Sequence, residues 1–220
     1  MHLNFPPGKK YTCLLFLFCV ICGAYGQNTS KSWIKPKEVG LLLNKADEKN
    51  FLFDDNDYFY QTTTIKGQLL YTLFAWKKFE FNLIVQPQYQ RIKHQLLNPS
   101  FIGPEIPDYL IKRAVFTTLK SINLYAMEFG ISIHRAIAKK LTTELTVGLG
   151  FAFIDTETER LAKGFTFIEN GSLGISYNTS ERTSVYFGGN IGHVSNFEFK
   201  QPNDGYNIIG YEIGFRYTLK

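Results

Sequence analysis

A histidine and a serine, His193 and Ser195, stand two residues apart in a segment of alternating polar and apolar residues, 182–195. Residues two apart on a β-strand share a face, so these two side chains share one with Phe187 and Ile191. They lie roughly 6.6 Å apart along the strand, within reach of each other after modest side-chain leaning. A base beside a hydroxyl is what a nucleophilic serine needs. Its place on an apolar face favours a lipid as the substrate.

The pair belongs to one of eight segments in which residue character alternates with a period of two. In residues 141–155, apolar side chains such as Val147 and Phe151 alternate with Glu144 and with small residues such as Gly148. Such alternation predicts strands with one apolar face, and about ten residues suffice to cross a bilayer at a tilt. The predicted strands are 36–44, 57–73, 78–94, 121–135, 141–155, 164–178, 182–195 and 206–219.

The polar face of these strands is rich in glycine and in charged residues, unlike the water-facing side of a soluble sandwich. Small and charged residues inside with aromatic residues outside are typical of outer-membrane barrels. An even number of antiparallel strands can also close and leave no free edge. The predicted fold is all-β, an eight-stranded antiparallel transmembrane β-barrel of the bacterial outer membrane. The side chains expected to pair across its lumen are Glu80, Glu128, Glu144, Glu212, Lys66 and Arg216.

The connections between the predicted strands alternate in length. Short turns are expected at 75–77, 136–140 and 179–181, and long loops at 45–56, 95–120, 156–163 and 196–205. Short turns of such barrels lie in the periplasm and long loops lie outside. The end of the strand that carries the histidine and the serine is therefore expected at the outer leaflet.

The first 26 residues are predicted to be a cleaved signal peptide. Lys9 and Lys10 precede an apolar run, 13–24, and Ala24-Tyr25-Gly26 supplies the small residues that signal peptidase accepts. The run is short for a membrane-spanning helix, which needs ~20 residues. The predicted organisation is thus a signal peptide, 1–26, followed by the outer-membrane barrel, 27–220.

Cysteine use and charge exclude several kinds of chemistry. Cys13, Cys19 and Cys22 all lie in the predicted signal peptide, so the mature chain has no thiol nucleophile and no disulfide. Removing Lys9 and Lys10 leaves 22 basic against 19 acidic residues, a net charge of +3 that argues little for nucleic acid. The four histidines show no metal-ligand spacing, and no glycine-rich phosphate loop precedes a helix. No cofactor is expected.

Residues 193–196 read His-Val-Ser-Asn, and residues 200–205 read Lys-Gln-Pro-Asn-Asp-Gly. Together they resemble the C-terminal signature of the lipid A 3-O-deacylase family, eight-stranded outer-membrane esterases of Gram-negative bacteria. The signature covers about fifteen residues; elsewhere the likeness is one of strand pattern and length. Without it, a histidine and a serine at the edge of a lipid-facing strand are more simply interfacial polar residues.

The resemblance implies a role for each residue that matches the signature. Ser195 matches the nucleophile, His193 the general base, and Asn203 a residue that helps to stabilise the oxyanion. The acidic member of the family's triad falls on Asn207. An asparagine there can still accept from the imidazole N–H, as in Cys-His-Asn hydrolases, but stabilises the imidazolium less than a carboxylate does.

Two residues compete for the third position of this triad. If the last two strands join through the loop 196–205, Asn207 falls about opposite His193. Glu169 interrupts the apolar row of the preceding strand, and a tight turn near residue 180 would pair it with about Ile191, one diagonal step from His193. A carboxylate facing hydrocarbon is costly unless it lies near the headgroups with a partner, which makes Glu169 the alternative acid.

The sequence and the resemblance together predict an esterase that removes an ester-linked acyl chain from lipid A in the outer leaflet. The alternative is a non-catalytic small outer-membrane barrel with a structural or adhesion role. A third candidate, acyl transfer, would need a cavity for an acyl chain inside the barrel. The identity of the acyl chain, the role of the long loop 95–120 and the formation of a homodimer stay open.

Overall fold

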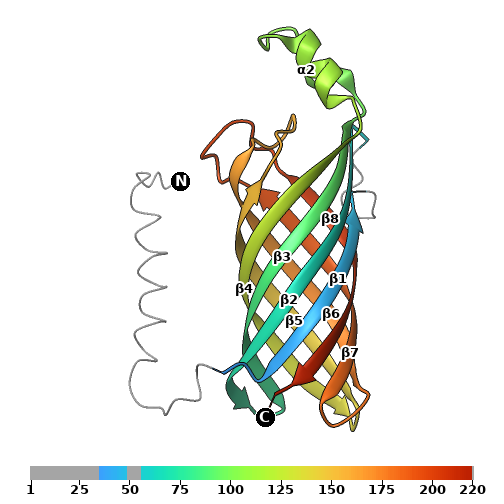
Figure 1. The fold of residues 1–220 in the computed structure, drawn as a ribbon, viewed down its shortest axis with the longest axis vertical. Coiled ribbons are helices and arrows are strands. Elements are labelled where there is room, and N and C mark those ends of the chain that lie inside the picture. The colour runs from blue at the N-terminus through green and yellow to red at the C-terminus, as the bar shows by residue number, and fades with distance from the viewer. Residues whose placement is uncertain (1–34, 49–55, 220) are drawn as a thin grey trace, which may run out of the picture. The chain divides into compact units, whose positions relative to one another are not determined.

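The computed structural model describes residues 35–48 and 56–219, and the predicted signal peptide lies outside them. Eight antiparallel strands form a closed barrel in which each strand pairs with its neighbours in the sequence and β1 pairs with β8 (Figure 1). The predicted fold is confirmed. The strands are β1 Glu38–Asp47, β2 Tyr58–Trp76, β3 Phe79–Leu96, β4 Lys120–Ala138, β5 Leu141–Ile154, β6 Gly164–Asn178, β7 Thr183–Ser195 and β8 Tyr206–Thr218.

The alternation of the sequence sets which side chains face the lumen. In β5, Glu144 is buried, whereas Leu145, Val147 and Phe151 are exposed on the outer wall. The strand bounds differ from those predicted by up to three residues: β1 begins at Glu38 and continues to Asp47, and β2 and β4 end three residues later than predicted. None of the helices among the described residues is long and apolar enough to cross a membrane.

The lumen is filled by ion pairs in its middle. Lys66 Nζ lies 3.2 Å from Glu212 Oε1 and 3.8 Å from Glu128 Oε2, and Arg216 Nη1 lies 2.6 Å from Glu144 Oε2. The predicted pairing across the lumen therefore holds for these five groups. Glu80, the sixth, pairs instead with Lys37 Nζ at 2.7 Å, a partner that the sequence analysis did not name.

An apolar and aromatic cluster closes the lumen toward the long loops. The rings of Tyr60 and Tyr206 stack with their centroids 4.6 Å apart, and the Tyr206 hydroxyl donates to Gln90 Oε1 at 2.9 Å. Val194 of β7 and Ile208 of β8 belong to the same buried cluster. The inner sides of β7 and β8 are thus packed against a solid core, which holds their outer sides in place.

The long connection between β3 and β4 has structure of its own. It contains the 3₁₀ helix Pro99–Phe101 and the helix α2, Tyr109–Phe116, which lies beyond the outer ends of β3 and β4 (Figure 1). Phe116 packs with Leu96 and Ile102 in a small separate core. The connection that was expected to be a long loop is therefore folded and has apolar contacts of its own.

Replacing Lys66 by methionine is expected to destabilise the barrel by about 3–5 kcal/mol, because Glu128 and Glu212 would then be buried without their cation. The measurement is guanidinium unfolding of the barrel in lipid vesicles. Lys45→Met, at an exposed position of β1, serves as the control and is expected to change stability by less than about 0.5 kcal/mol. Equal losses in the two variants would contradict the role assigned to the lumen pairs.

Candidate active site

His193 and Ser195 lie on the outer face of β7, near its extracellular end. Their neighbours Gly192 and Val194 are buried on the inner side, whereas Ile191 is exposed on the outer wall. The histidine is half-buried and Ser195 is only 9% exposed. Both predicted catalytic side chains therefore belong to the lipid-facing wall and not to the lumen.

Asn207, the first outward residue of β8, pairs directly with His193, as the sequence analysis expected. His193 Nδ1 lies 2.6 Å from Asn207 Oδ1. An amide oxygen can only accept, so Nδ1 of the ring is the nitrogen that carries the proton in this contact. Nε2 of the neutral ring is then free to accept a proton, which is the form that a general base needs.

Glu169 lies closer to His193 than the sequence analysis placed it. The predicted partner of Glu169, Ile191, pairs instead with Gly171, and Glu169 pairs with His193 itself. The prediction was wrong by two residues because the turn is centred later in the chain: the N–H groups of Thr179 and Ser180 both donate to the Thr183 carbonyl. The exposed carboxylate of Glu169 on β6 thus lies beside the imidazole of His193 on β7.

The Ser195 backbone is fixed, although its hydroxyl is not. The Thr166 hydroxyl donates to the Ser195 carbonyl at 2.7 Å and anchors the end of β7 to β6. Within the described part of the chain, no hydrogen bond joins the Ser195 hydroxyl to the His193 ring. Because the two side chains share a face at a spacing of two residues, side-chain rotation alone can bring them together.

Asn203 lies in the loop after β7 and holds the residue that follows the serine. The backbone N–H of Asn196 donates to Asn203 Oδ1 at 2.6 Å. An N–H cannot accept, so the amide oxygen of Asn203 must face it and the NH₂ group of the same amide is turned the other way. That NH₂ group has no hydrogen-bond partner among the described residues and is available as a donor. The Asn196 N–H, in contrast, is already occupied.

The loops on either side of the site are bonded to each other. The Ala162 N–H donates to the Pro202 carbonyl at 2.9 Å, and the Gly205 N–H donates to the Arg160 carbonyl at 3.0 Å. The side-chain amide of Asn196, which is buried, donates to the Lys200 carbonyl at 2.7 Å. These bonds give the loop 196–205 a defined course past the serine.

Gly205 lies at the site, although the sequence indicated it only as the last residue of the signature, with no role of its own. Its φ of 66° lies in the left-handed region. A Cβ at this position would lie 2.3 Å from the Val194 carbonyl oxygen and 3.3 Å from both His193 Cε1 and Ser195 Cβ. The missing side chain therefore leaves the space in which the histidine and the serine face each other. The signature includes this glycine, but only the fold shows which atoms it lies against.

A shallow groove of about 540 Å³ runs along the outer wall beside these residues. Glu169, His193 and Asn207 line it from three neighbouring strands, and Leu149 and Ile191 supply apolar walls. None of the residues that line this groove comes from the connection 97–119. The site is therefore open sideways, in the direction from which a membrane lipid approaches.

A second apolar surface lies on the other side of the serine. The ring of Phe167, which pairs with Ser195, lies 4.6 Å from that of Phe197 in the loop after β7. Phe199 of the same loop lies 6.0 Å from Phe167. The loop thus brings two aromatic side chains down onto the lipid-facing wall next to the candidate nucleophile.

Comparison with known proteins adds a family match over this part of the chain. A family model described as Lipid A 3-O-deacylase (PagL) matches residues 121–216, which include Glu169, His193, Ser195, Asn203 and Asn207. The resemblance to the lipid A 3-O-deacylase family is confirmed. The protein is accordingly a barrel of the bacterial outer membrane.

Solved structures with a similar fold include the outer membrane enzyme PagL, with 13% identity, a TM-score of 0.52, and coverage of 83% of this chain and 99% of that one. Neisserial surface protein A is also similar, with 13% identity, a TM-score of 0.44, and coverage of 83% and 96%. At these identities the likeness concerns the fold alone. No curated protein matches the sequence. Among the described residues, no three histidine, cysteine, aspartate or glutamate side chains are grouped as metal ligands.

Gly205→Ala is expected to displace the loop after β7 and to destabilise it by about 1–3 kcal/mol, since the new Cβ meets a backbone oxygen at a left-handed position. Amide hydrogen exchange at Asn196 and Gly205 measures the effect and should become faster. Gly189→Ala is the control, because the atom nearest to a Cβ there, the Gly210 carbonyl oxygen, lies at 3.9 Å. Unchanged protection in the Gly205 variant would contradict the tight fit.

Proposed function

We propose that this protein is a serine esterase that removes an ester-linked acyl chain from lipid A, with Ser195 as nucleophile and His193 as general base. The family match supports a deacylase-like function and hence the class of ester hydrolases. The observation that carries the residue assignment is the 2.6 Å contact between His193 Nδ1 and Asn207 Oδ1. It leaves Nε2 of an outward-facing imidazole unprotonated, on the same face as Ser195.

In the proposed reaction, His193 Nε2 takes the proton of the Ser195 hydroxyl as Oγ bonds to the ester carbonyl carbon. The bond between that carbon and the sugar oxygen then breaks, and the imidazolium returns the proton to the departing oxygen. Water, deprotonated by the same nitrogen, then attacks the acyl carbon, the bond between that carbon and Ser195 Oγ breaks, and the imidazolium returns the proton to Oγ as the fatty acid leaves. No cofactor takes part in these steps.

Asn207 and Glu169 divide the task of the family's acidic residue in this proposal. The Asn207 oxygen holds the imidazole tautomer and its orientation through the hydrogen bond at Nδ1. The Glu169 carboxylate, cross-strand from His193 on the other side, supplies the negative charge that favours the imidazolium. Glu169 thus acts through the histidine.

Asn203 is the proposed donor to the oxyanion. Its NH₂ group is held in orientation because the Asn196 N–H occupies the oxygen of the same amide. A preoriented donor stabilises the negative charge that develops on the carbonyl oxygen during attack. The Asn196 N–H itself is excluded from that role while it remains bonded to Asn203.

The surroundings of the site fit a membrane lipid as the substrate. The site opens onto the outer wall of the barrel, where lipid A of the outer leaflet can present its ester bonds without leaving the membrane. Residues 1–26 are proposed to direct export and to be removed. A homodimer finds no support in the comparisons.

Acyl transfer to a chain held inside the barrel is disfavoured by the contents of the lumen. A cavity in its middle measures about 10 Å³ and is lined by polar side chains, including Lys66, Glu128 and Glu212. This space is about that of one water molecule and too small and too polar for an acyl chain. The outward orientation of Ser195 also argues against transfer to a chain inside the lumen.

Ser195→Ala is expected to abolish deacylation, with a loss of about 10³-fold or more. The measurement is mass spectrometry of lipid A from a bacterium whose lipid A carries ester-linked 3-hydroxyacyl chains. Cells that produce the unaltered protein should accumulate lipid A that is lighter by one acyl chain. Ser184→Ala, at the opposite end of β7, is the control and should keep this product. Identical lipid A with and without Ser195 would contradict the proposed function.

Asn207→Asp is expected to raise kcat by about tenfold or more, because a carboxylate at Nδ1 stabilises the imidazolium better than an amide. Glu169→Gln is expected to lower kcat in the unaltered background and to have a smaller effect when it is combined with Asn207→Asp. Initial rates of lipid A deacylation in mixed micelles measure both effects. Glu181→Gln in the turn between β6 and β7 is the charge-matched control. Additive effects of the two substitutions would mean that Glu169 does not act through the histidine.

A further inference from the structure

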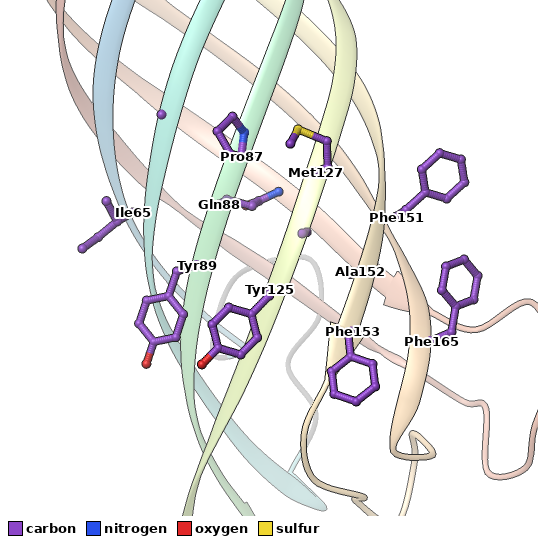
Figure 2. A pocket seen from close by; sticks show the side chains of 12 residues that line it. Ile65, Pro87, Gln88, Tyr89, Tyr125, Met127, Phe151, Ala152, Phe153 and Phe165 are labelled. Atoms are coloured by element: carbon purple, nitrogen blue, oxygen red, sulfur yellow. The ribbon is translucent and has the colours of Figure 1, made fainter.

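A second hollow lies on the outer wall of the barrel, away from the groove at His193. It measures about 630 Å³ and extends from β2 to β6 (Figure 2). Figure 2 shows the rings of Tyr89 and Tyr125 beside each other on one edge and Phe153 and Phe165 on the other. We call it the wall recess, lined by Ile65, Gly67, Pro87, Gln88, Tyr89, Tyr125, Ala126, Met127, Phe151, Ala152, Phe153 and Phe165.

The wall recess exists because short outward residues interrupt a wall of long ones. Gly67 of β2 has no side chain, and the neighbouring outward position on β3 is Pro87, whose ring is compact. Met127 of β4 lies next to Pro87 in the register. The surrounding outward side chains are aromatic or branched. The short residues Gly67 and Pro87 therefore form a floor that lies below the rim of the recess.

The strand register connects the wall recess with the candidate nucleophile in a single row. Ser195 pairs with Phe167, Phe167 with Phe151, and Phe151 with Met127. Neighbouring strands lie about 4.7–4.9 Å apart, so three steps separate Ser195 from Met127 by roughly 14 Å around the wall. The recess is therefore a lateral neighbour of Ser195 on the same face.

Aromatic rings cover the wall between the two places. The ring of Phe167 lies 5.8 Å from that of Phe151 and 4.9 Å from that of Phe165. Phe151 and Phe165 line the wall recess, and Phe167 contacts Phe197 beside Ser195. The apolar surface is thus continuous from the recess to the serine.

The outer rim of the wall recess carries the polar groups expected where hydrocarbon meets headgroups. The Tyr89 hydroxyl donates to Asn123 Oδ1 at 2.7 Å, and tyrosines of this kind are enriched at that boundary. Beyond Tyr89 on the same face of β3 come Arg91 and Lys93, both exposed. Apolar chains below and an anionic headgroup above would complement this surface.

The occupant of such a hollow has to be a lipid chain. The wall recess faces the hydrocarbon of the bilayer, and its outward side chains are apolar, so water is not stabilised there. Measured around the wall, the recess lies several acyl-chain widths from Ser195. The acyl chain whose ester bond lies at the serine therefore does not also fill the recess. A lipid that carries several acyl chains on one headgroup covers such a lateral distance.

We propose that the wall recess binds a second acyl chain of the same lipid molecule whose ester bond lies at Ser195. This inference rests on the proposed function. The recess makes the protein selective for lipids with several acyl chains, because a single-chain ester reaches Ser195 without filling it. It also fixes the direction in which the headgroup lies, across β6, β5 and β4 and toward the cations of β3.

The test fills the hollow with Met127→Trp and compares two substrates, hexa-acylated lipid A and the single-chain ester p-nitrophenyl palmitate. The ratio of kcat/KM for lipid A to kcat/KM for the ester is expected to fall about tenfold, the loss for about two displaced methylene groups. Leu43→Trp, an equally bulky change at an exposed outward position of β1, is the control and should leave the ratio as it is. An unchanged ratio in the Met127 variant, or an equal fall in both variants, overturns the proposal.

A binding measurement separates this inference from the proposed function. In the Ser195→Ala background, native mass spectrometry counts the hexa-acylated lipid A molecules that stay with each barrel after extraction. Met127→Trp should lower this retention, and Leu43→Trp should not. If the unaltered protein hydrolyses neither substrate, the esterase proposal fails. Retention of lipid A then still tests whether the wall recess binds an acyl chain. Retention that does not depend on Met127 overturns the recess itself.

Discussion

Each residue in the strands of a closed barrel faces either the lumen or the lipid, and the pairing of β7 with β8 decides which of the two His193 meets. His193 pairs with Asn207 on the outer side, and the next pair, Val194 with Tyr206, is buried inside. A slip of one residue would exchange the two faces. The site therefore depends on side chains that touch no substrate, because the packing of Val194 and Tyr206 in the inner cluster holds the register.

Charge is distributed over the barrel in a way that sets the site apart. In the middle of the lumen, the carboxylates of Glu128, Glu144 and Glu212 lie beside cations, as a narrow interior demands. On the outer wall, Glu169 has no such cation among the described residues and is the sixth residue of β6, near the extracellular end. A carboxylate facing lipid is tolerated best near the headgroups, where water is also available for hydrolysis. The position that makes Glu169 tolerable is also the position that the proposed mechanism requires.

Much of this architecture was predictable from the sequence, because alternation with a period of two reports directly on burial. It located the eight strands and the lumen side of Lys66 and Arg216, and the length of the loop 196–205 placed Asn207 opposite His193. The position of Glu169 was wrong by two residues, since hydrogen bonds at Thr183 shift the centre of a turn in a way that composition does not reveal. Contacts between loops, such as that between Gly205 and Arg160, and the helix α2 depend on tertiary packing and left no periodic signal.

In the proposed mechanism, an asparagine at the position implied for the family's acidic residue, Asn207, changes how charge can reach the histidine. The Nδ1 position is saturated by the amide oxygen at 2.6 Å, so no carboxylate can bond there at the same time. In the proposed mechanism Glu169 therefore acts through its field, from a cross-strand position where paired Cβ atoms lie about 4.5–5.5 Å apart. Such a field is weak in bulk water, but at the boundary between headgroups and hydrocarbon the effective dielectric constant is lower and the attraction to an imidazolium is stronger. In the proposed mechanism, a neutral residue that orients the ring and a nearby charge on another strand together replace one carboxylate, and the place of the site at the edge of the hydrocarbon strengthens the attraction between that charge and the ring.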